Sequence, residues 1–332
     1  MNILITGGAG YIGSHIIKQL LVLKIHRLTI VDNFQTGFEE TINTLKQYGD
    51  FEFINQDLSN WDEIENIFIK NNFEVVMHFA ASLLVGESIK NPTKYYINNT
   101  SNSANLVNLC SKYGVKKFIF SSTAAVYGEP SIDKMPLCEE TITNPINPYG
   151  YSKLFTEQII KDMSIADRNF KYIILRYFNV AGAEESLNIG ECHEPETHLI
   201  PLVAKTALGK RSKIMVFGDD YNTNDGTCIR DYIHVDDLAS AHLACLEYLE
   251  NNDSNTFNCG YGHGFSVMEV IQTIKKVSNC DFEVEITNRR QGDPAILVAS
   301  NKKILKQTSW KPKYDNLEFI CKTALEWEKT IK

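Results

Sequence analysis

The sequence predicts an α/β protein built on a doubly wound parallel sheet, with a smaller α/β portion interleaved into it. A short apolar run at residues 3–5 leads directly into a glycine-rich turn and then into a helical pattern. Apolar runs and helical patterns then alternate through the first 180 residues, and from Ala181 the alternation gives way to loops and shorter runs. This order is typical of a Rossmann-type fold, in which crossover helices cover both faces of the sheet.

The glycine-rich turn predicts a phosphate-binding site. Glycines stand at positions 7, 10 and 13, and a helical pattern runs from Ser14 to Leu23. Glycines permit a tight turn, a close approach of the backbone to a pyrophosphate and close packing of helix on strand. The helix N-terminus adds N–H donors and the positive end of the helix dipole. We therefore expect a dinucleotide to contact Gly7, Gly10, Tyr11, Ile12 and Gly13.

The second predicted strand ends at an acidic residue that indicates which dinucleotide binds. Residues 28–31 form this strand, and Asp32 and Asn33 follow it, with Asp32 19 residues after Gly13. A carboxylate at this place accepts hydrogen bonds from both hydroxyls of an adenine ribose and repels a 2′-phosphate. The sequence therefore predicts NAD rather than NADP. A turn aspartate beside an unrelated glycine loop is the alternative, which the strand–turn–helix context disfavours.

Further strands are expected at residues 51–54, 75–78, 117–120 and 172–175, with helices around 61–70, 93–113 and 150–166 between them. Ligands of such sheets bind beyond the carboxyl ends of the strands. The segments at these ends are Asp57-Leu58, Phe79-Ala80-Ala81, Ser121-Ser122-Thr123 and Arg176-Tyr177-Phe178-Asn179. We expect all four segments to line one crevice.

Beyond Ala181 the chain is expected to form a second domain and then to return to the first. Residues 190–195 have a loop composition, a short helix leads from His198 to Gly209, and strands or turns follow at 216–219 and 226–232. An apolar helix over 235–249 and a strand at 256–258 then rejoin the sheet. The predicted division is residues 1–180 plus about 232–260 for the dinucleotide, and about 181–231 plus 261–332 for the substrate.

Tyr149 and Lys153 form the candidate catalytic pair. At this spacing they lie on one face of a helix that Asn147 can cap and Pro148 can begin. A free phenol has a pKa of about 10, and a neighbouring ammonium lowers it by favouring the phenolate. Such a pair can remove a proton from an alcohol. The same spacing is common on solvated helix faces, so the assignment depends on its surroundings.

Composition excludes several classes of protein. The formal charge of −8 argues against a nucleic-acid partner. The longest nearly apolar run, residues 75–86, contains His78 and is too short to span a bilayer, and the N-terminus lacks the features of a signal peptide. The eight cysteines form no Cys-x-x-Cys pair, so we expect reduced thiols in a cytoplasmic protein and no metal site.

Together these motifs resemble the extended short-chain dehydrogenase/reductase family, and within it the chain looks like the UDP-glucose 4-epimerases over its full length. The matching segments are 7–15, 121–128, 177–179, 230–235 and 289–293. The resemblance implies an isomerase that interconverts UDP-glucose and UDP-galactose with NAD. C4 is oxidised to a transient ketone, and hydride returns to the opposite face. The N-acetylated pair, UDP-GlcNAc and UDP-GalNAc, stays open as further substrates.

The resemblance also implies a role for each site residue. Tyr149 removes the 4-hydroxyl proton and returns it, Lys153 lowers the Tyr149 pKa and binds the nicotinamide ribose, and Thr123 hydrogen-bonds the reacting oxygen. Besides the glycine turn, Asp32, Asn33, Tyr149 and Lys153, the implied cofactor contacts are Asp57, Leu58, Phe79, Ala80, Ala81, Asn98, Tyr177 and Phe178. Besides Thr123 and Tyr149, the implied substrate contacts are Asn179, Arg230 and Arg290 at the diphosphate, together with His198, Leu199, Val216, Phe217, Asp293 and Leu297.

Three positions depart from what is common in the family. Leu83 stands where some epimerases have a lysine near the cofactor. His198 stands where many relatives have asparagine, and a purely structural role for it is equally open. Leu297 lies at the position that faces the 2-substituent of the sugar. Tyrosine there favours the plain hexoses and a small residue admits N-acetyl sugars, so leucine is intermediate.

Other readings remain open at this point. A 4,6-dehydratase commonly carries an Asp-Glu pair directly after the active-site threonine, whereas Ala124 and Ala125 follow Thr123 here, and alanine transfers no proton. A nucleotide-sugar decarboxylase of the same family is a second alternative. A non-catalytic NAD sensor would need the glycine turn but neither Tyr149 nor Lys153. The family resemblance also implies a homodimer through the helices around 93–113 and 150–166.

Overall fold

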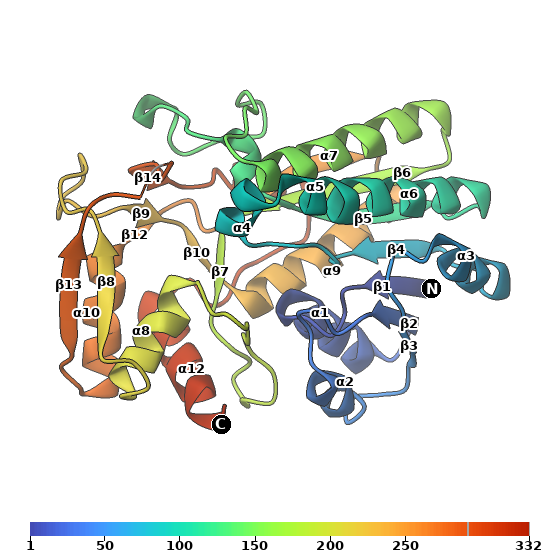
Figure 1. Cartoon of the computed structure of the whole chain (residues 1–332). Coiled ribbons are helices and arrows are strands. Elements are labelled where there is room, and N and C mark those ends of the chain that lie inside the picture. The colour runs from blue at the N-terminus through green and yellow to red at the C-terminus, as the bar shows by residue number, and fades with distance from the viewer. Residues whose placement is uncertain (291, 332) are drawn as a thin grey trace.

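The computed structural model describes residues 1–290 and 292–331, and its centre is a seven-stranded sheet (Figure 1). The strand order is β11-β6-β5-β4-β1-β2-β3, and every pair of neighbours is parallel. The strands are β1 Asn2–Thr6, β2 Arg27–Asp32, β3 Glu52–Asn55, β4 Val75–His78, β5 Lys117–Thr123, β6 Lys171–Tyr177 and β11 Asn255–Cys259. The order reverses direction between β1 and β4, so the predicted doubly wound sheet is confirmed, and a ligand crevice is expected at that reversal.

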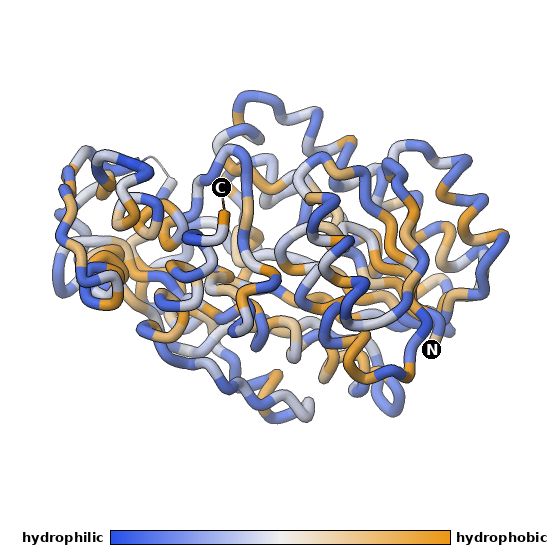
Figure 2. Tube along the Cα trace, turned by 90° about the horizontal axis from the view of Figure 1, so that it is seen from below, coloured by the Kyte–Doolittle hydropathy of each residue, from blue (hydrophilic) through white to orange (hydrophobic). Residues whose placement is uncertain are grey.

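Helices cover both faces of this sheet (Figure 1). One face carries α1 Tyr11–Leu23, α2 Glu39–Leu45 and α9 Val235–Asn251, and the other carries α3 Trp61–Lys70, α6 Asn102–Lys112 and α7 Pro148–Ala166. Successive strand residues point to opposite faces, so Ile3 and Ile5 join the core under α1 while Leu4 joins the core under α3 and α6. Figure 2 shows the resulting hydrophobic interior and the more hydrophilic outer turns of the helices.

The single helix expected over residues 93–113 is instead interrupted. After α4 Val85–Lys90, the chain forms α5 Pro92–Tyr95, then a π-helical stretch η1 Tyr96–Ser101, and then α6. Side-chain amides stabilise this widened turn, because Asn98 Nδ2 donates to Ser82 Oγ at 3.0 Å and Asn99 Nδ2 donates to Ser152 Oγ at 3.0 Å. Widened turns of this kind often occur at functional sites, and this one directs Asn98 toward the crevice.

The second portion of the chain lies beyond the carboxyl ends of the strands (Figure 1). It contains three small sheets, which are β7 Asn179–Ala181 with β10 Tyr232–His234, β8 Lys213–Phe217 with β13 Glu283–Thr287, and β12 Phe265–Ser266 with β9 Ile229–Arg230 and β14 Ile296–Leu297. Its helices are α8 Leu199–Ala207, α10 Val267–Ser278, α11 Lys302–Gln307 and α12 Leu317–Thr330. Two short 3-10 helices, η2 Ala124–Tyr127 and η3 Ile132–Lys134, follow β5.

Two boundaries in this portion differ from the expectation, and both are set by glycine. The strand expected at 216–219 begins earlier and ends at Phe217, because Gly218 has a φ of +89°. The helix expected to end at Gly209 ends at Ala207, and Gly209 follows with a φ of +74°. Positive φ is costly for other residues and favours glycine. Gln291, in the expected loop 289–293, lies outside the described residues.

The chain returns to the first sheet as expected. β11 pairs with β6 at the sheet edge, and α9 lies against α1. Partly buried polar contacts connect α9 to α1, since His15 Nδ1 lies 2.7 Å from Asp236 Oδ1 and Gln19 Nε2 donates to Asp236 O at 2.9 Å. Across residues 1–290 and 292–331, none of the helices has the length and apolar character needed to cross a bilayer.

Candidate functional site

The glycine turn forms a cradle between β1 and α1. A Cβ at Gly7, whose φ is +77°, would lie 2.5 Å from Ala80 N, and a Cβ at Gly13 would lie 2.3 Å from Gly7 O. A Cβ at Gly10 would meet only Gly7 O, at 3.5 Å, so that side of the turn is open. Gly10 is also the N-cap of α1, where no side chain satisfies the helix N–H groups and no acidic residue occupies the first turn. Backbone donors at an open, uncapped helix start fit the pyrophosphate of a dinucleotide.

The acidic end of the crevice is held in place by backbone donors. Asp32 Oδ2 accepts from Ala9 N at 2.9 Å, and Oδ1 accepts from Phe34 N at 2.8 Å. Burial raises the pKa of Asp32, while the backbone hydrogen bonds oppose that shift. These bonds aim the carboxylate at the crevice, where an adenine ribose would meet it.

A cavity of about 250 Å³ adjoins this carboxylate and contains the remaining expected adenosine contacts. Asn33 Nδ2 donates to Asp57 Oδ2 at 2.5 Å across it. The other expected residues that line it are Leu58, Ala80, Ala81 and Asn98. The structure thus brings together side chains from the ends of three strands, β2, β3 and β4, and from η1.

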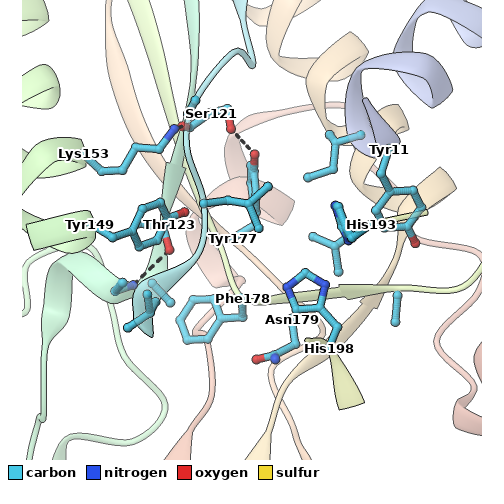
Figure 3. Close-up of a pocket in the computed structure, with 18 of the residues that line it drawn as sticks. Tyr11, Ser121, Thr123, Tyr149, Lys153, Tyr177, Phe178, Asn179, His193 and His198 are labelled. Carbon is cyan, nitrogen blue, oxygen red and sulfur yellow. Dashed lines mark hydrogen bonds between the residues drawn. The ribbon is translucent and has the colours of Figure 1, made fainter. Parts of the chain in front are cut away.

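The candidate catalytic residues meet where β5 ends and α7 begins (Figure 3). Asn147 caps α7, its Oδ1 accepting from Gly150 N at 2.8 Å, and Pro148 is the first helical residue, as predicted. Lys153 is 4% exposed, and its Nζ donates to Ser121 O at 2.9 Å. Tyr149 lies beside Thr123 at the wall of a cavity of about 420 Å³ (Figure 3). Both side chains of the pair therefore face a cavity of ligand size.

Burial changes the acidity of both members of the pair. It raises the pKa of Tyr149, which the neighbouring Thr123 hydroxyl opposes, and it lowers the pKa of Lys153 to about 7. In the protein without cofactor, the Tyr149 pKa is therefore raised and not lowered as expected. The expected lowering stays a prediction for the enzyme with bound NAD. A lysine with a pKa of about 7 changes its charge near neutral pH, where it can influence the phenol.

Most of the expected substrate contacts line the same cavity. They are Asn179, His198, Leu199, Arg230, Asp293 and Leu297. Arg230 is held by two carbonyls, since its Nη1 donates to Ile229 O at 2.9 Å and to Pro294 O at 2.8 Å. Tyr177 and Phe178, expected as cofactor contacts, form part of the wall with Phe79, Ala80 and Ala81.

Three expected substrate contacts lie outside this lining. Val216 is buried in the hydrophobic core, so only its backbone could meet a ligand. The Arg290 guanidinium stacks 4.6 Å from the centre of the Phe217 ring, and its Nε donates to Asp293 Oδ2 at 2.9 Å. Their contact with a substrate stays a prediction.

Two residues of the expected crevice segments face away from it. Ser122 Oγ donates to Glu157 Oε1 at 2.6 Å, and Arg176 Nη2 donates to Glu157 Oε2 at 2.6 Å. They are buried on the opposite side of the sheet, because alternate strand residues point to opposite faces. The expectation that all four segments line one crevice in full is therefore wrong for these two residues.

Several residues of the cavity wall were not predicted from the sequence. Tyr232, Thr36, Pro201 and His193 line the cavity. His193 has a sequence signal that went unused, because glutamate and histidine recur at positions 191, 193, 196 and 198. The other three carry no local signal.

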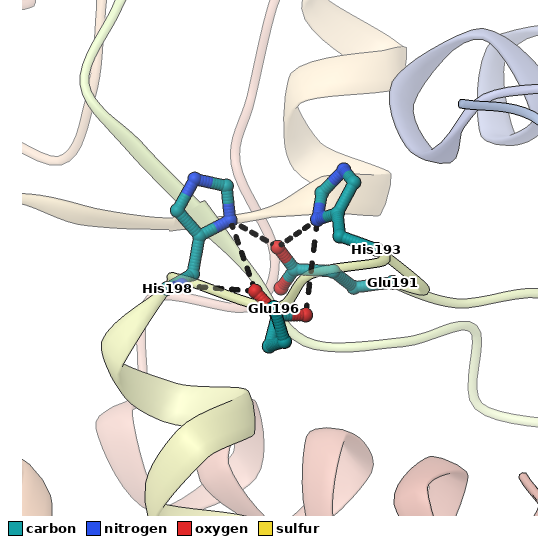
Figure 4. Close-up of side chains that lie close together, drawn as sticks. All are labelled: Glu191, His193, Glu196 and His198. Carbon is teal, nitrogen blue, oxygen red and sulfur yellow. Dashed lines mark hydrogen bonds and ion pairs between the residues drawn. The ribbon is translucent and has the colours of Figure 1, made fainter. Parts of the chain in front are cut away.

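A cluster of four titratable side chains lies just before α8 (Figure 4). Its members are Glu191, His193, Glu196 and His198. Burial alone would raise the pKa of Glu191, but His198 and His193 outweigh it and lower that pKa to about 2. Burial alone would lower the pKa of His193, but Glu191 and Glu196 outweigh it and raise that pKa to about 9. In the protein alone the cluster is thus a set of ion pairs.

The fold and the site together define an NAD-binding enzyme of the short-chain dehydrogenase/reductase kind. A doubly wound sheet, an open glycine cradle, a carboxylate after the second strand and a tyrosine–lysine helix face converge on one crevice. This arrangement places a nicotinamide dinucleotide site beside a tyrosine that can transfer a proton.

Comparison with known proteins agrees with this class. The profile of the NAD dependent epimerase/dehydratase family matches residues 3–260. The chain is 45% identical over 330 residues to the UDP-glucose 4-epimerase of Halalkalibacterium halodurans, covering 99% of this chain and 96% of the relative. It is similar to the UDP-Glc/GlcNAc 4-epimerase of Campylobacter jejuni, with 52% identity, a TM-score of 0.88 and 99% of both chains covered. It is also similar to the UDP-glucose 4-epimerase of Bifidobacterium longum in complex with NAD⁺ and UDP, with 38% identity, a TM-score of 0.94 and coverage of 100% and 99%.

The chain belongs to the NAD dependent epimerase/dehydratase family, and its relatives over the full length are UDP-glucose 4-epimerases. The expected class of activity, an isomerase with NAD as its cofactor, is confirmed, as is the epimerase interpretation over the dehydratase, decarboxylase and sensor alternatives.

Proposed function

We propose that the crevice inverts C4 of UDP-glucose and UDP-galactose with Tyr149, Lys153 and Thr123 as its catalytic residues. The observation that carries this proposal is that Tyr149 and Thr123 line the same cavity as the glycine cradle. A hydride acceptor held by the cradle and a base at Tyr149 can therefore meet one sugar carbon. Bound NAD supplies that acceptor and, once reduced, the donor that returns the hydride.

Tyr149 carries the proton in this proposal. Its phenolate removes the 4-hydroxyl proton as the carbon is oxidised, and the phenol gives it back when the hydroxyl re-forms. Thr123 donates to the reacting oxygen and holds it near the phenol. Lys153 is buried with its Nζ on Ser121 O, and its protonated form favours the phenolate. Phe178 and Tyr177 form a largely apolar part of the wall at this end of the cavity.

The diphosphate is proposed to lie between Asn179, Arg230 and Arg290. Arginine suits this role because its planar fork offers two donors to phosphate oxygens at once. Arg230 is well placed, since its side chain is 13% exposed and is oriented by two carbonyls. Asp293 is proposed to bind the uridine ribose, and Leu199 with the backbone at Val216 and the ring of Phe217 to flank the uracil.

The N-acetylated sugars are proposed as additional substrates. Leu297 lines the cavity and packs against the apolar cluster that contains Phe178. Leucine fills less space than tyrosine, so a 2-acetamido group has more room beside it. The 52% identical Campylobacter jejuni protein is named a UDP-Glc/GlcNAc 4-epimerase, which supports the same breadth here.

We propose that residues 1–180 plus about 232–260 form the NAD-binding domain and that about 181–231 plus 261–332 form the UDP-sugar domain. The glycine cradle, Asp32 and Tyr149 all come from the first set, while Arg230 and Leu297 come from the second. The pairing of β11 with β6 supports the return of the chain near residue 255.

A homodimer in the cytoplasm is proposed as the working form. Exposed hydrophobic side chains lie on the helices named for the interface, among them Ile97 and Phe155. The Phe155 ring lies 5.9 Å from the Tyr96 ring and 5.9 Å from the Tyr151 ring, so η1 and α7 present a joint aromatic surface. All eight cysteines are free, which suits a reducing compartment.

Conversion of UDP-galactose to UDP-glucose by the purified protein and by Tyr149→Phe tests the proposal. The wild type should convert UDP-galactose to UDP-glucose. The variant should keep its fold and its bound NAD, but its kcat should fall by a factor of about 10²–10⁴, the usual contribution of a positioned proton-transfer group. Tyr151→Phe is the matched control, because it removes a phenol two residues away on the same helix. Near-normal turnover by Tyr149→Phe would place the base elsewhere.

A further inference from the structure

The segment 190–198, here called the strap, runs along the cofactor side of the crevice between β7 and α8. His193 and His198 line the large cavity, while Glu194 and Pro195 line the adjoining cavity beside Asp32 and Asn98. Its start is anchored, because Trp327 Nε1 donates to Glu191 O at 2.7 Å and the Trp327 ring packs over Gly190. The strap thus borders both cavities.

Four side chains of the strap converge on one point (Figure 4). Glu191, His193, Glu196 and His198 each offer one ligand atom, and these atoms all lie within 4.8 Å of one another. Glu191 is 5% exposed, and the carboxylate of Glu196 accepts from the backbone N of Thr197 at 2.7 Å and of His198 at 2.9 Å. Such outer contacts orient ligand atoms before anything binds.

Three of the four nitrogen–oxygen separations in the cluster are longer than a charge-assisted hydrogen bond, and the shortest of these three matches the spacing of two ligands of one zinc ion. His193 Nδ1 lies 3.3 Å from Glu191 Oε1 and 3.8 Å from Glu196 Oε2, and His198 Nδ1 lies 3.9 Å from Glu196 Oε1. Charge-assisted N–H···O bonds are shorter, about 2.7–2.9 Å. Ligands of a tetrahedral zinc ion, about 2.0–2.2 Å from the metal, are separated by about 3.3–3.6 Å.

Binding of an ion would change two features of the cluster, a nitrogen that lacks a hydrogen bond within the described residues and a short contact. His193 Nδ1 is buried and makes no hydrogen bond to any of the described residues. His198 Nδ1 and Glu191 Oε1 are in direct contact, closer than two ligands of one ion, so that pair must separate. The His198 side chain is 45% exposed, so its ring has room to move when an ion separates the pair.

We propose that Glu191, His193, Glu196 and His198 bind a divalent ion of the zinc class that ties the two ends of the strap together beside the cofactor crevice. Two imidazole nitrogens and two carboxylate oxygens suit zinc, whereas magnesium prefers oxygen ligands and water. Two neutral imidazoles and two carboxylates carry a charge of −2, which balances the ion. The site borders the crevice but contains none of Tyr149, Lys153 and Thr123, so binding of the ion can be measured without the epimerase reaction.

The experiment measures binding of Co²⁺, whose visible absorption reports tetrahedral coordination, to the NAD-loaded protein after dialysis against chelator. One ion per chain is expected, displaced by Zn²⁺, with hydrogen exchange of the amides of 190–198 slowed at least about tenfold on binding. Glu196→Gln and His193→Gln are each expected to weaken Co²⁺ binding by at least about 100-fold, more than the 10–100-fold typical of outer-sphere changes.

His263→Gln is the matched control, because His263 lies in an exposed pair with Asp315 at 2.8 Å and should leave Co²⁺ binding unchanged. Two variants are used so that a misfolded one, detected by circular dichroism, leaves the other to decide. A wild-type protein without a tetrahedral Co²⁺ spectrum, or variants that bind as tightly as the wild type, would overturn the proposal and leave the cluster as ion pairs alone.

Discussion

At the scale of single residues, Asp32 is the side chain that we expect to discriminate between the two nicotinamide dinucleotides. Its carboxylate is fixed by Ala9 N and Phe34 N, so it cannot turn away from a 2′-phosphate. Two like charges about 4 Å apart repel by about 4 kcal/mol at an effective dielectric constant of about 20.

We therefore expect NAD to bind at least about 100-fold more tightly than NADP, measured by titration of the cofactor-free protein. Asp32→Asn should reduce this ratio by about tenfold or more, since it removes the repelling charge but keeps the shape. Asp62→Asn on α3 is the control for a lost surface carboxylate. Equal affinities of the wild type for NAD and NADP would show that the carboxylate does not discriminate against the 2′-phosphate.

Leu297 is the second residue that carries a prediction. Leu297→Tyr should abolish turnover of UDP-GlcNAc and UDP-GalNAc while sparing the plain hexoses, because overpacking penalises only the larger substrate. The measurement is kcat/KM for both sugar pairs. Leu297→Met, which nearly conserves volume, should change neither pair much. If Leu297→Tyr lowers kcat/KM equally for both sugar pairs, another residue limits the size of the 2-substituent.

At the scale of elements, the exposed face of α5, η1 and α7 is the clearest feature that the monomer does not explain. Ile97 and Phe155 are 60% and 46% exposed on it. Large exposed apolar patches mark interaction sites in many proteins.

If the wild type is the proposed homodimer, Phe155→Glu is expected to shift it to a monomer at micromolar concentration, as measured by light scattering. A charge in the middle of an apolar interface must be desolvated, which costs several kcal/mol. Ile69→Glu on α3 also replaces an exposed apolar side chain but lies on another helix, so it should stay dimeric. A wild-type protein of monomeric mass would refute the homodimer.

At the scale of the whole molecule, buried neutral histidines determine how the fold responds to acid. Burial lowers the pKa of His78 to about 3 and the pKa of His234 and of His242 to about 4. His78 shows why, since its Nδ1 lies 2.7 Å from Thr6 Oγ1 and its Nε2 lies 2.7 Å from Ser103 Oγ in the core.

The unfolded chain binds protons at these three groups below about pH 6.5, whereas the folded chain binds them only near pH 3–4. Their contribution to stability is therefore present above pH 6.5 and is lost as the pH falls through this window. These three histidines should together contribute a slope that approaches about 4 kcal/mol per pH unit once all three are protonated in the unfolded chain, partly offset by Asp231, whose pKa burial raises to about 6. Urea unfolding between pH 7 and 5 measures it.

The control for this prediction removes one of the three groups. His242→Leu should lower the slope by about a third, because one titrating histidine is gone. A stability that does not change between pH 7 and 5 would mean that these histidines are protonated in the folded chain.

The sequence by itself determined those features of this protein that depend on residues close together in the chain. The glycine turn, the acidic end of β2 and the Asn147-capped helix carrying Tyr149 and Lys153 were all predictable from spacing within a few residues. Turn geometry, capping and the helical period act over such distances. These local features were sufficient to predict the fold class and the nucleotide chemistry.

Only the tertiary structure decided which of these residues share a space. Ser122 and Arg176 turn away to Glu157, Val216 enters the core, and the helix over 93–113 contains a π-helical stretch because Asn98 and Asn99 bond to Ser82 and Ser152. The same holds for the cluster around Glu191. Its spacing is visible in the chain, but the convergence of four ligand atoms depends on how residues 190–198 lie between β7 and α8. Contacts between residues far apart in sequence depend on long-range packing, which no local pattern encodes.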